Sequence, residues 1–149
     1  MSTLINFHSE DVDFHLVNEK KTIKWIKDSI KNETKIVGEI SYIFCSDEYL
    51  HKMNLEYLNH DTFTDIITFD YTEENIVSGD IFISIDRVKE NATKFNTSIN
   101  SAQAFESELS RVIIHGVLHL MGYKDKSAQE KEQMRSKEDF YLTLLIEKG

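Results

Sequence analysis

Proline is absent from the 149-residue sequence, and only one residue is a cysteine. That residue, Cys45, lies in an apolar run, where we expect a buried thiol in a strand. A single cysteine excludes an internal disulfide, and a zinc finger would need further cysteines. This use of cysteine fits a reducing compartment.

Long apolar runs are also missing. No stretch approaches the roughly 20 apolar residues that a membrane-spanning helix needs. The first 14 residues contain Glu10, Asp11 and Asp13 and lack the apolar centre of a signal peptide. With five glycines and no proline, no segment is typical of a linker or a repeat. The sequence therefore predicts one soluble, cytoplasmic domain over residues 1–149, with no membrane partner.

Positive charge is scarce, because 17 lysines and arginines face 26 acidic residues and the net charge is −9. An acidic chain does not bind nucleic acid broadly, so such a partner would need a local basic patch. Five lysines recur at steps of three and four residues: Lys20, Lys24, Lys27, Lys31 and Lys35. A solvated helix face is the favoured interpretation, and a surface that follows a phosphate backbone is the alternative.

Hydrophobic periodicity predicts strands and helices in alternation. Strands are predicted over residues 4–7, 39–45, 66–71 and 80–85, with residues 72–79 as a hairpin connection. Helices are predicted over residues 17–32, 47–58, 86–95 and 102–121, with a last helix after Ser127. This order predicts an α+β fold, in which a small mixed β-sheet is packed with helices.

The stretch that carries chemistry is RVIIHGVLHLMGYKD, residues 111–125. His115 and His119 are four residues apart, so a helix projects both imidazoles from one face toward a shared metal ion. Gly122 ends the helix, and Asp125 follows after a sharp turn. The spacing matches the metzincin plan, in which a glycine turn returns a third ligand to the metal. We expect His115, His119 and Asp125 to bind one zinc ion at the C-terminal end of the long helix.

Two nitrogens and one oxygen leave a fourth tetrahedral position for water, as catalytic zinc sites require. Zinc can lower the pKa of that water to about 7, so the motif predicts a metal-dependent hydrolase. A protease would carry a glutamate directly after the first histidine, where this chain has Gly116. The glycine argues against a peptidase and leaves the general base unassigned. Two histidines merely packed in a helix would need buried partners for both rings.

The motif HGVLHLMGYKD resembles the signature of the YbeY family, bacterial metal-dependent endoribonucleases of ribosomal RNA maturation. Residues 53–71, MNLEYLNHDTFTDIITFDY, and residues 78–84, SGDIFIS, are similar to two further family blocks, and Glu130 and Met134 extend the likeness. The resemblance implies a compact α+β fold, one zinc ion held by three side chains, and single-stranded ribosomal RNA as substrate. It also implies a role in 16S rRNA 3′-end maturation and ribosome quality control, with the small ribosomal subunit as partner and no dinucleotide cofactor.

Two positions depart from the family pattern. The commonest family motif ends in Asp-His, where this chain has Lys124 and Asp125; a carboxylate is a harder ligand that can change the choice of metal. Many members carry an arginine in the central block, where this chain has Leu58, which cannot hold a phosphate. His60 or Lys124 substitutes for that arginine, or activity is weaker than in typical members.

Candidate catalytic residues are therefore Asp65, His60 and Lys124. Asp65 begins a predicted strand and is a candidate general base or hydrogen-bond partner of a ligand; the alternative is a strand-end acceptor. Asp80 is open to the same two interpretations, and for it the strand-end acceptor is favoured. Two other functions stay open: a zinc peptidase-like hydrolase, and a non-catalytic ribosome-assembly factor with a structural zinc, which the Leu58 departure supports.

Overall fold

Four strands and five helices make up the computed structural model, which describes residues 4–59, 64–95 and 100–148. The strands are β1 (Ile5–Ser9), β2 (Ile36–Cys45), β3 (Ile66–Asp70) and β4 (Ile76–Ser84). The helices are α1 (Glu19–Asn32), α2 (Asp47–Leu58), α3 (Ile85–Phe95), α4 (Ser101–Leu120) and α5 (Ala128–Lys148). The order confirms the predicted α+β class. Within the described ranges, none of the helices has the length and apolar character needed to cross a membrane.

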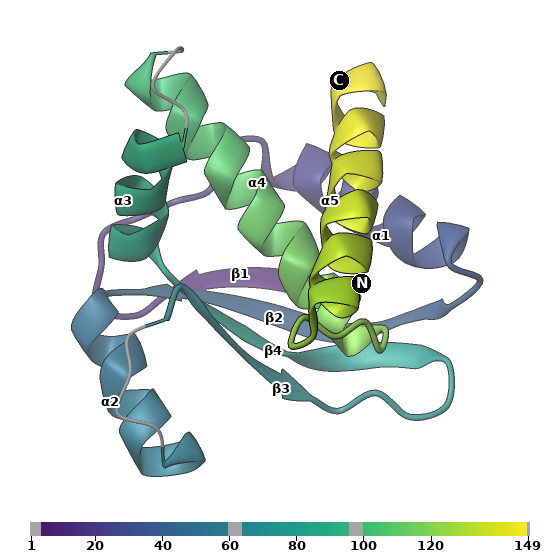
Figure 1. The fold of residues 1–149 in the computed structure, drawn as a ribbon, viewed down its shortest axis with the longest axis horizontal. Helices are drawn as coiled ribbons and strands as arrows, with labels where there is room; N and C mark the ends of the chain where they lie inside the picture. The colour runs from purple at the N-terminus through teal and green to yellow at the C-terminus, as the bar shows by residue number, and fades with distance from the viewer. Residues whose placement is uncertain (1–3, 60–63, 96–99, 149) are drawn as a thin grey trace.

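The sheet is mixed and runs in the order β1-β2-β4-β3 (Figure 1). β1 pairs with β2 and β2 pairs with β4, both in parallel. β3 is antiparallel to β4 and forms the edge of the sheet. Parallel neighbours need crossover connections, and α1 and α2 lie in those connections. The other three helices, α3, α4 and α5, follow the last strand.

Figure 1 shows α1, α3, α4 and α5 on one side of the sheet and α2 on the other. The larger core lies between the sheet and α4, where Ile81 and Ile83 of β4 belong to the same buried cluster as Ile113 and Val117. On the opposite face, α2 covers a smaller cluster that contains the buried Cys45. α4 is thus held against the centre of the sheet, which positions its C-terminal end.

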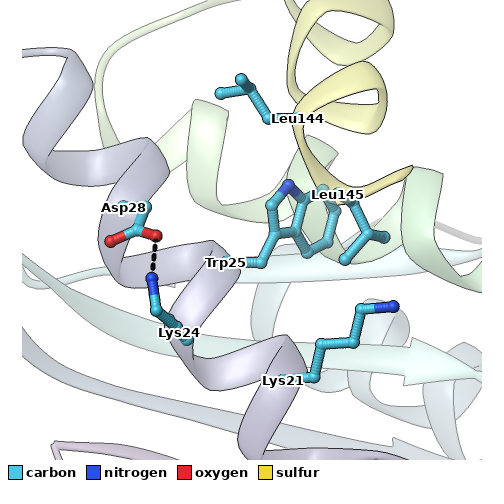
Figure 2. Close-up of a pocket in the computed structure, with 6 residues that line it drawn as sticks. All are labelled: Lys21, Lys24, Trp25, Asp28, Leu144 and Leu145. Carbon is cyan, nitrogen blue, oxygen red and sulfur yellow. Dashed lines mark hydrogen bonds and ion pairs between the residues drawn. The ribbon is translucent and has the colours of Figure 1, made fainter. Parts of the chain in front are cut away.

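α1 packs against α5 through Trp25, which is buried and donates its indole N–H to the backbone carbonyl of Tyr141 at 2.7 Å. Figure 2 shows Leu145 of α5 beside the indole. Trp25 and Leu145 line a pocket between the two helices, and Lys24, which also lines it, pairs with Asp28 at 2.8 Å. Of the five lysines in the predicted face, Lys20, Lys24 and Lys31 are exposed, whereas Lys27 is half-buried and Lys35 lies beyond the end of α1.

Two predicted helix starts are confirmed by their hydrogen bonds. The Ser46 hydroxyl accepts from the backbone N–H of Tyr49 at 3.1 Å and caps α2. Ser127 and Glu130 form the expected capping box: each accepts from the other's backbone N–H, at 3.1 and 2.9 Å. The box fixes the start of α5 directly after the predicted metal-binding loop.

Several element boundaries differ from the prediction, and the largest difference concerns residues 72–79, which are not all connection, because β4 begins at Ile76. Ile76 and Val77 pair with Ile36 and Val37, which also start β2 three residues before the predicted 39. Gly79 looked like a turn residue but lies inside the strand, where an added Cβ would be 2.7 Å from Leu120 of α4. Pairing with a distant strand and the close approach of a helix decided this region, and neither is visible in local sequence.

Candidate metal centre

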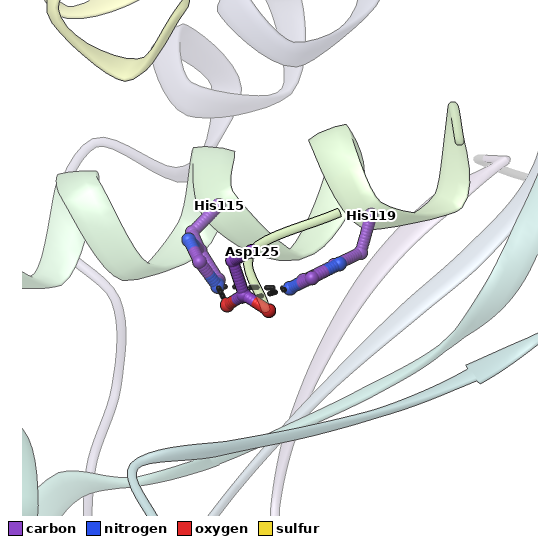
Figure 3. Close-up of side chains that lie close together, drawn as sticks. All are labelled: His115, His119 and Asp125. Atoms are coloured by element: carbon purple, nitrogen blue, oxygen red, sulfur yellow. Dashed lines mark hydrogen bonds and ion pairs between the residues drawn. The ribbon is translucent and has the colours of Figure 1, made fainter. Parts of the chain in front are cut away.

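The last two turns of α4 carry His115 and His119 on one face, and the chain then reverses at Gly122. Gly122 has φ of +100°, a backbone conformation that L side chains rarely adopt. The turn brings Asp125 back beneath the helix, so that its carboxylate points toward both imidazoles (Figure 3). The structure therefore brings together the three residues that the sequence predicted as metal ligands.

The three donor atoms converge on one point. His115 Nε2 and His119 Nε2 are 3.0 Å apart, and Asp125 Oδ2 lies 3.2 Å from the first and 3.3 Å from the second. Metal–ligand bonds of about 2.0–2.2 Å in a tetrahedron separate the donor atoms by roughly 3.3–3.6 Å. A small outward movement of the side chains is enough to admit an ion of this kind.

Hydrogen bonds at the far side of each ring fix which nitrogen faces the metal position. His119 Nδ1 lies 3.0 Å from the backbone carbonyl of Tyr123, which can only accept, so Nδ1 carries the proton. His115 Nδ1 lies 2.6 Å from a carboxylate oxygen of Glu138 and donates in the same way. With Nδ1 protonated on each ring, the two Nε2 atoms face each other at 3.0 Å, where they can share a proton or a metal ion. When both rings are neutral, their Nε2 lone pairs are available to one metal ion, so these residues fit a bound metal.

Glu138 is held between His115 and Arg111. Arg111 donates through Nη1 to Glu138 Oε1 at 2.7 Å and through Nη2 to Asp139 at 2.9 Å. Burial raises the pKa of Glu138, but the bonds from His115 and Arg111 outweigh it and lower the pKa overall. The Glu138 carboxylate thus stays ionised and orients the His115 ring.

The two ligand histidines differ in basicity. Burial lowers the pKa of His115, but the hydrogen bond and charge of Glu138, with help from Asp125, raise it overall. His119 has a lowered pKa because burial and the neighbouring charge of His115 outweigh the attraction of Asp125. The side chains of the two histidines and of Asp125 are between 20% and 38% exposed, so water and a substrate can reach the site.

Asp65 lies just before β3 and next to Ile66, which packs against Gly116 of α4. Its pKa is raised because burial outweighs the favourable charge of His115, so the two groups are close enough for their charges to interact. Lys124 is exposed on the loop next to Asp125. His60, the remaining predicted catalytic residue, lies outside the described residues. Leu58 ends α2 and is 40% exposed.

Asp80 does not join the site. Its neighbours in β4, Gly79 and Ile81, face α4, so the alternation of the strand turns Asp80 to the opposite face of the sheet. There its carboxylate accepts a hydrogen bond of 3.3 Å from the Tyr71 hydroxyl. The structural interpretation of Asp80 therefore agrees with its position.

Sequence reasoning missed Glu138 and Tyr123 as partners of the ligand histidines. Tyr123 lies within the motif, but nothing in its side chain marks the role of its backbone carbonyl. Glu138 is 23 residues beyond His115 in a helix rich in acidic residues. No local pattern distinguishes it from the solvated glutamates around it.

Residues 4–145 match the family model described as endoribonuclease YbeY. A Flavobacterium johnsoniae protein named endoribonuclease YbeY is 57% identical over 136 residues, which cover 91% of this chain and 93% of the relative. A Christiangramia forsetii protein of the same name is 54% identical over 140 residues, covering 94% of this chain and 93% of that one. The solution structure of a Thermotoga maritima protein aligns with a TM-score of 0.60 and 28% identity, over 95% of this chain and 88% of the other.

Proposed function

The chain belongs to the endoribonuclease YbeY family, and from this premise we propose that it is a metal-dependent endoribonuclease that cleaves single-stranded ribosomal RNA. The convergence of His115, His119 and Asp125 on one point carries the proposal. By its family membership, its role is 16S rRNA 3′-end maturation and ribosome quality control on the small ribosomal subunit, in the cytoplasm. Residues 1–149 then act as one catalytic unit.

Zinc is the proposed metal, with one ion per chain held by the two imidazoles and the carboxylate. Two nitrogens and one oxygen at tetrahedral spacing suit zinc and leave a position open to water. When bound, the ion supplies Lewis acidity toward a phosphoryl oxygen and makes water a stronger nucleophile. Glu138 and the Tyr123 carbonyl keep both Nε2 atoms available for it.

Asp65 is the proposed general base. A carboxylate with a raised pKa is a better proton acceptor near neutral pH than an ordinary aspartate, and Asp65 has such a pKa and lies close enough to His115 for their charges to interact. Lys124, exposed beside Asp125, is the proposed contact for a substrate phosphate. His60 stays a candidate for the same contact, because family members commonly use an arginine near this point of the chain.

The peptidase alternative is disfavoured by the surroundings of Gly116. A Cβ at this position would lie 2.9 Å from Ile81 Cγ2 and 3.0 Å from Ile66 Cδ1. The position where a peptidase carries its glutamate therefore faces the packed sheet and has no room for a side chain. A non-catalytic assembly factor with a structural zinc remains the second candidate, because Leu58 offers no charge for a phosphate.

The test compares the wild type with His119→Ala on a short single-stranded ribosomal RNA fragment, with and without chelator, alongside a metal count. His15→Ala is the matched control, because the His15 side chain is exposed and is not part of the cluster of His115, His119 and Asp125. Wild type and control should carry about one metal ion and cleave, while His119→Ala should do neither. Equal cleavage by all three would indicate a contaminating nuclease. Bound metal and co-sedimentation with ribosomal particles, without cleavage, would favour the assembly factor.

A further inference from the structure

A half-buried carboxylate connects the metal-binding loop to two helices. Glu33 directly follows α1, and its side chain is 11% exposed. Tyr123 of the loop donates its hydroxyl to Glu33 Oε1 at 2.5 Å, and Tyr141 of α5 donates to Oε2. Lys137 of α5 also reaches Oε2, at 3.2 Å. Both oxygens of Glu33 are thus occupied by partners from distant parts of the chain.

These partners compensate for taking a charge out of water. Burial raises the pKa of Glu33, but the hydrogen bonds from Tyr123, Tyr141 and Lys137 outweigh it, so its pKa is lowered overall. The Lys137 ammonium also lies 5.5 Å from the centre of the Tyr123 ring, within the range of a cation–π contact. The Tyr123 side chain is therefore held at its hydroxyl and over its ring.

The backbone of the same tyrosine is part of the metal centre. Its carbonyl accepts the Nδ1 proton of His119 at 3.0 Å, and its N–H donates to the carbonyl of Leu118 at 3.1 Å. Asp125 follows two residues later. Any shift of the Tyr123 side chain would move the carbonyl that orients His119 and the segment that presents Asp125.

We propose that Glu33 is a positioning residue for the metal centre, which acts through the Tyr123 hydroxyl to hold the loop where His119 and Asp125 meet the metal. The inference rests on the proposed metal-dependent function and names a residue, outside the motif, on which metal affinity depends. Glu33 bonds to the side chains of Tyr123, Tyr141 and Lys137, and none of these is a candidate metal ligand.

The structure offers a matched pair of variants for the test. Tyr123→Phe and Tyr141→Phe each remove one hydroxyl from Glu33, but only Tyr123 belongs to the metal-binding loop. Zinc affinity of the apo-protein is measured by competition with a chromogenic chelator, and cobalt(II) absorption reports the ligand geometry. The melting temperature of each apo-protein reports the structural effect separately.

Tyr123→Phe should weaken zinc binding by roughly tenfold or more, as losses of partners around metal ligands do, and should change the cobalt spectrum. Tyr141→Phe should lower the melting temperature and leave zinc affinity and the cobalt spectrum as in the wild type. In a Glu33→Ala background, Tyr123→Phe should cause no further loss of affinity, because the contact is already gone. If Glu33→Ala does not fold, the pair of tyrosine variants decides alone.

Unchanged zinc affinity in Tyr123→Phe, or equal losses in both tyrosine variants, would overturn the inference and leave the proposed metal centre intact. A wild type that binds no zinc would instead remove the metal centre, and the inference with it. RNA cleavage does not enter the measurement, so the two failures are distinguishable.

Discussion

Glu138→Gln probes the link between the fold and the metal centre most directly. Glu138 accepts two charge-assisted hydrogen bonds, from His115 Nδ1 at 2.6 Å and from Arg111 at 2.7 Å. Glutamine has the same shape but only one oxygen, so one of its two contacts must become a donor. Arg111 can only donate and takes the oxygen, which leaves the amide NH₂ facing His115.

The His115 ring can satisfy that NH₂ only by moving its proton from Nδ1 to Nε2. The Nε2 lone pair is then no longer available to the metal, so binding must first reverse the tautomer. Loss of a carboxylate partner of a metal-bound histidine typically lowers metal affinity 10–100-fold, which is about 1.4–2.8 kcal/mol. We expect Glu138→Gln to fall in this range, with the fold retained.

The assay is chelator competition for zinc on the apo-protein, with Asp139→Asn as control. Asp139 also accepts from Arg111, at 2.9 Å, but its side chain is 58% exposed and makes no contact with His115 in the described structure. The control should bind zinc as the wild type does. Wild-type affinity in Glu138→Gln would refute the tautomer argument, and an equal loss in Asp139→Asn would assign the effect to Arg111.

Three further predictions test the metal, the packing and the charges. Removing zinc should lower the melting temperature by roughly 5–10 °C in calorimetry, because a ligand at 100 times its Kd stabilises by about 2.7 kcal/mol; no shift would contradict a bound metal. Gly116→Ala should cost about 1–3 kcal/mol in urea unfolding, because its Cβ would lie 2.9 Å from Ile81 and 3.0 Å from Ile66. Glu33 has a lowered pKa, so the stability that it contributes is present above its ordinary pKa of 4.5 and is lost as pH falls through the folded value. Acid unfolding of the apo-protein should therefore be less steep below pH 4.5 in Glu33→Gln, and identical slopes would count against the Glu33 network.

Local sequence was sufficient for much of the fold. The helix that carries His115 and His119 was predicted to within a residue at either end, because apolar periodicity and Gly122 mark its course and its end. Ser46 and the Ser127–Glu130 pair marked helix starts for the same reason: capping involves residues within one turn. The start of β4 was missed, because Ile76 is in a strand only through pairing with Ile36.

The candidate metal ligands could be predicted from the sequence by itself, because all three lie within 11 residues and two local rules bring them together. Helical spacing aligns the histidines, and a glycine at φ of +100° turns the aspartate back. The groups that orient those ligands depended on tertiary structure. Glu138 comes from the next helix, and Glu33 lies 90 residues before the tyrosine that it holds. These carboxylates orient the site only because packing places them against partners that no local pattern specifies. The need for a glycine at position 116 likewise follows from the close packing of the sheet against α4.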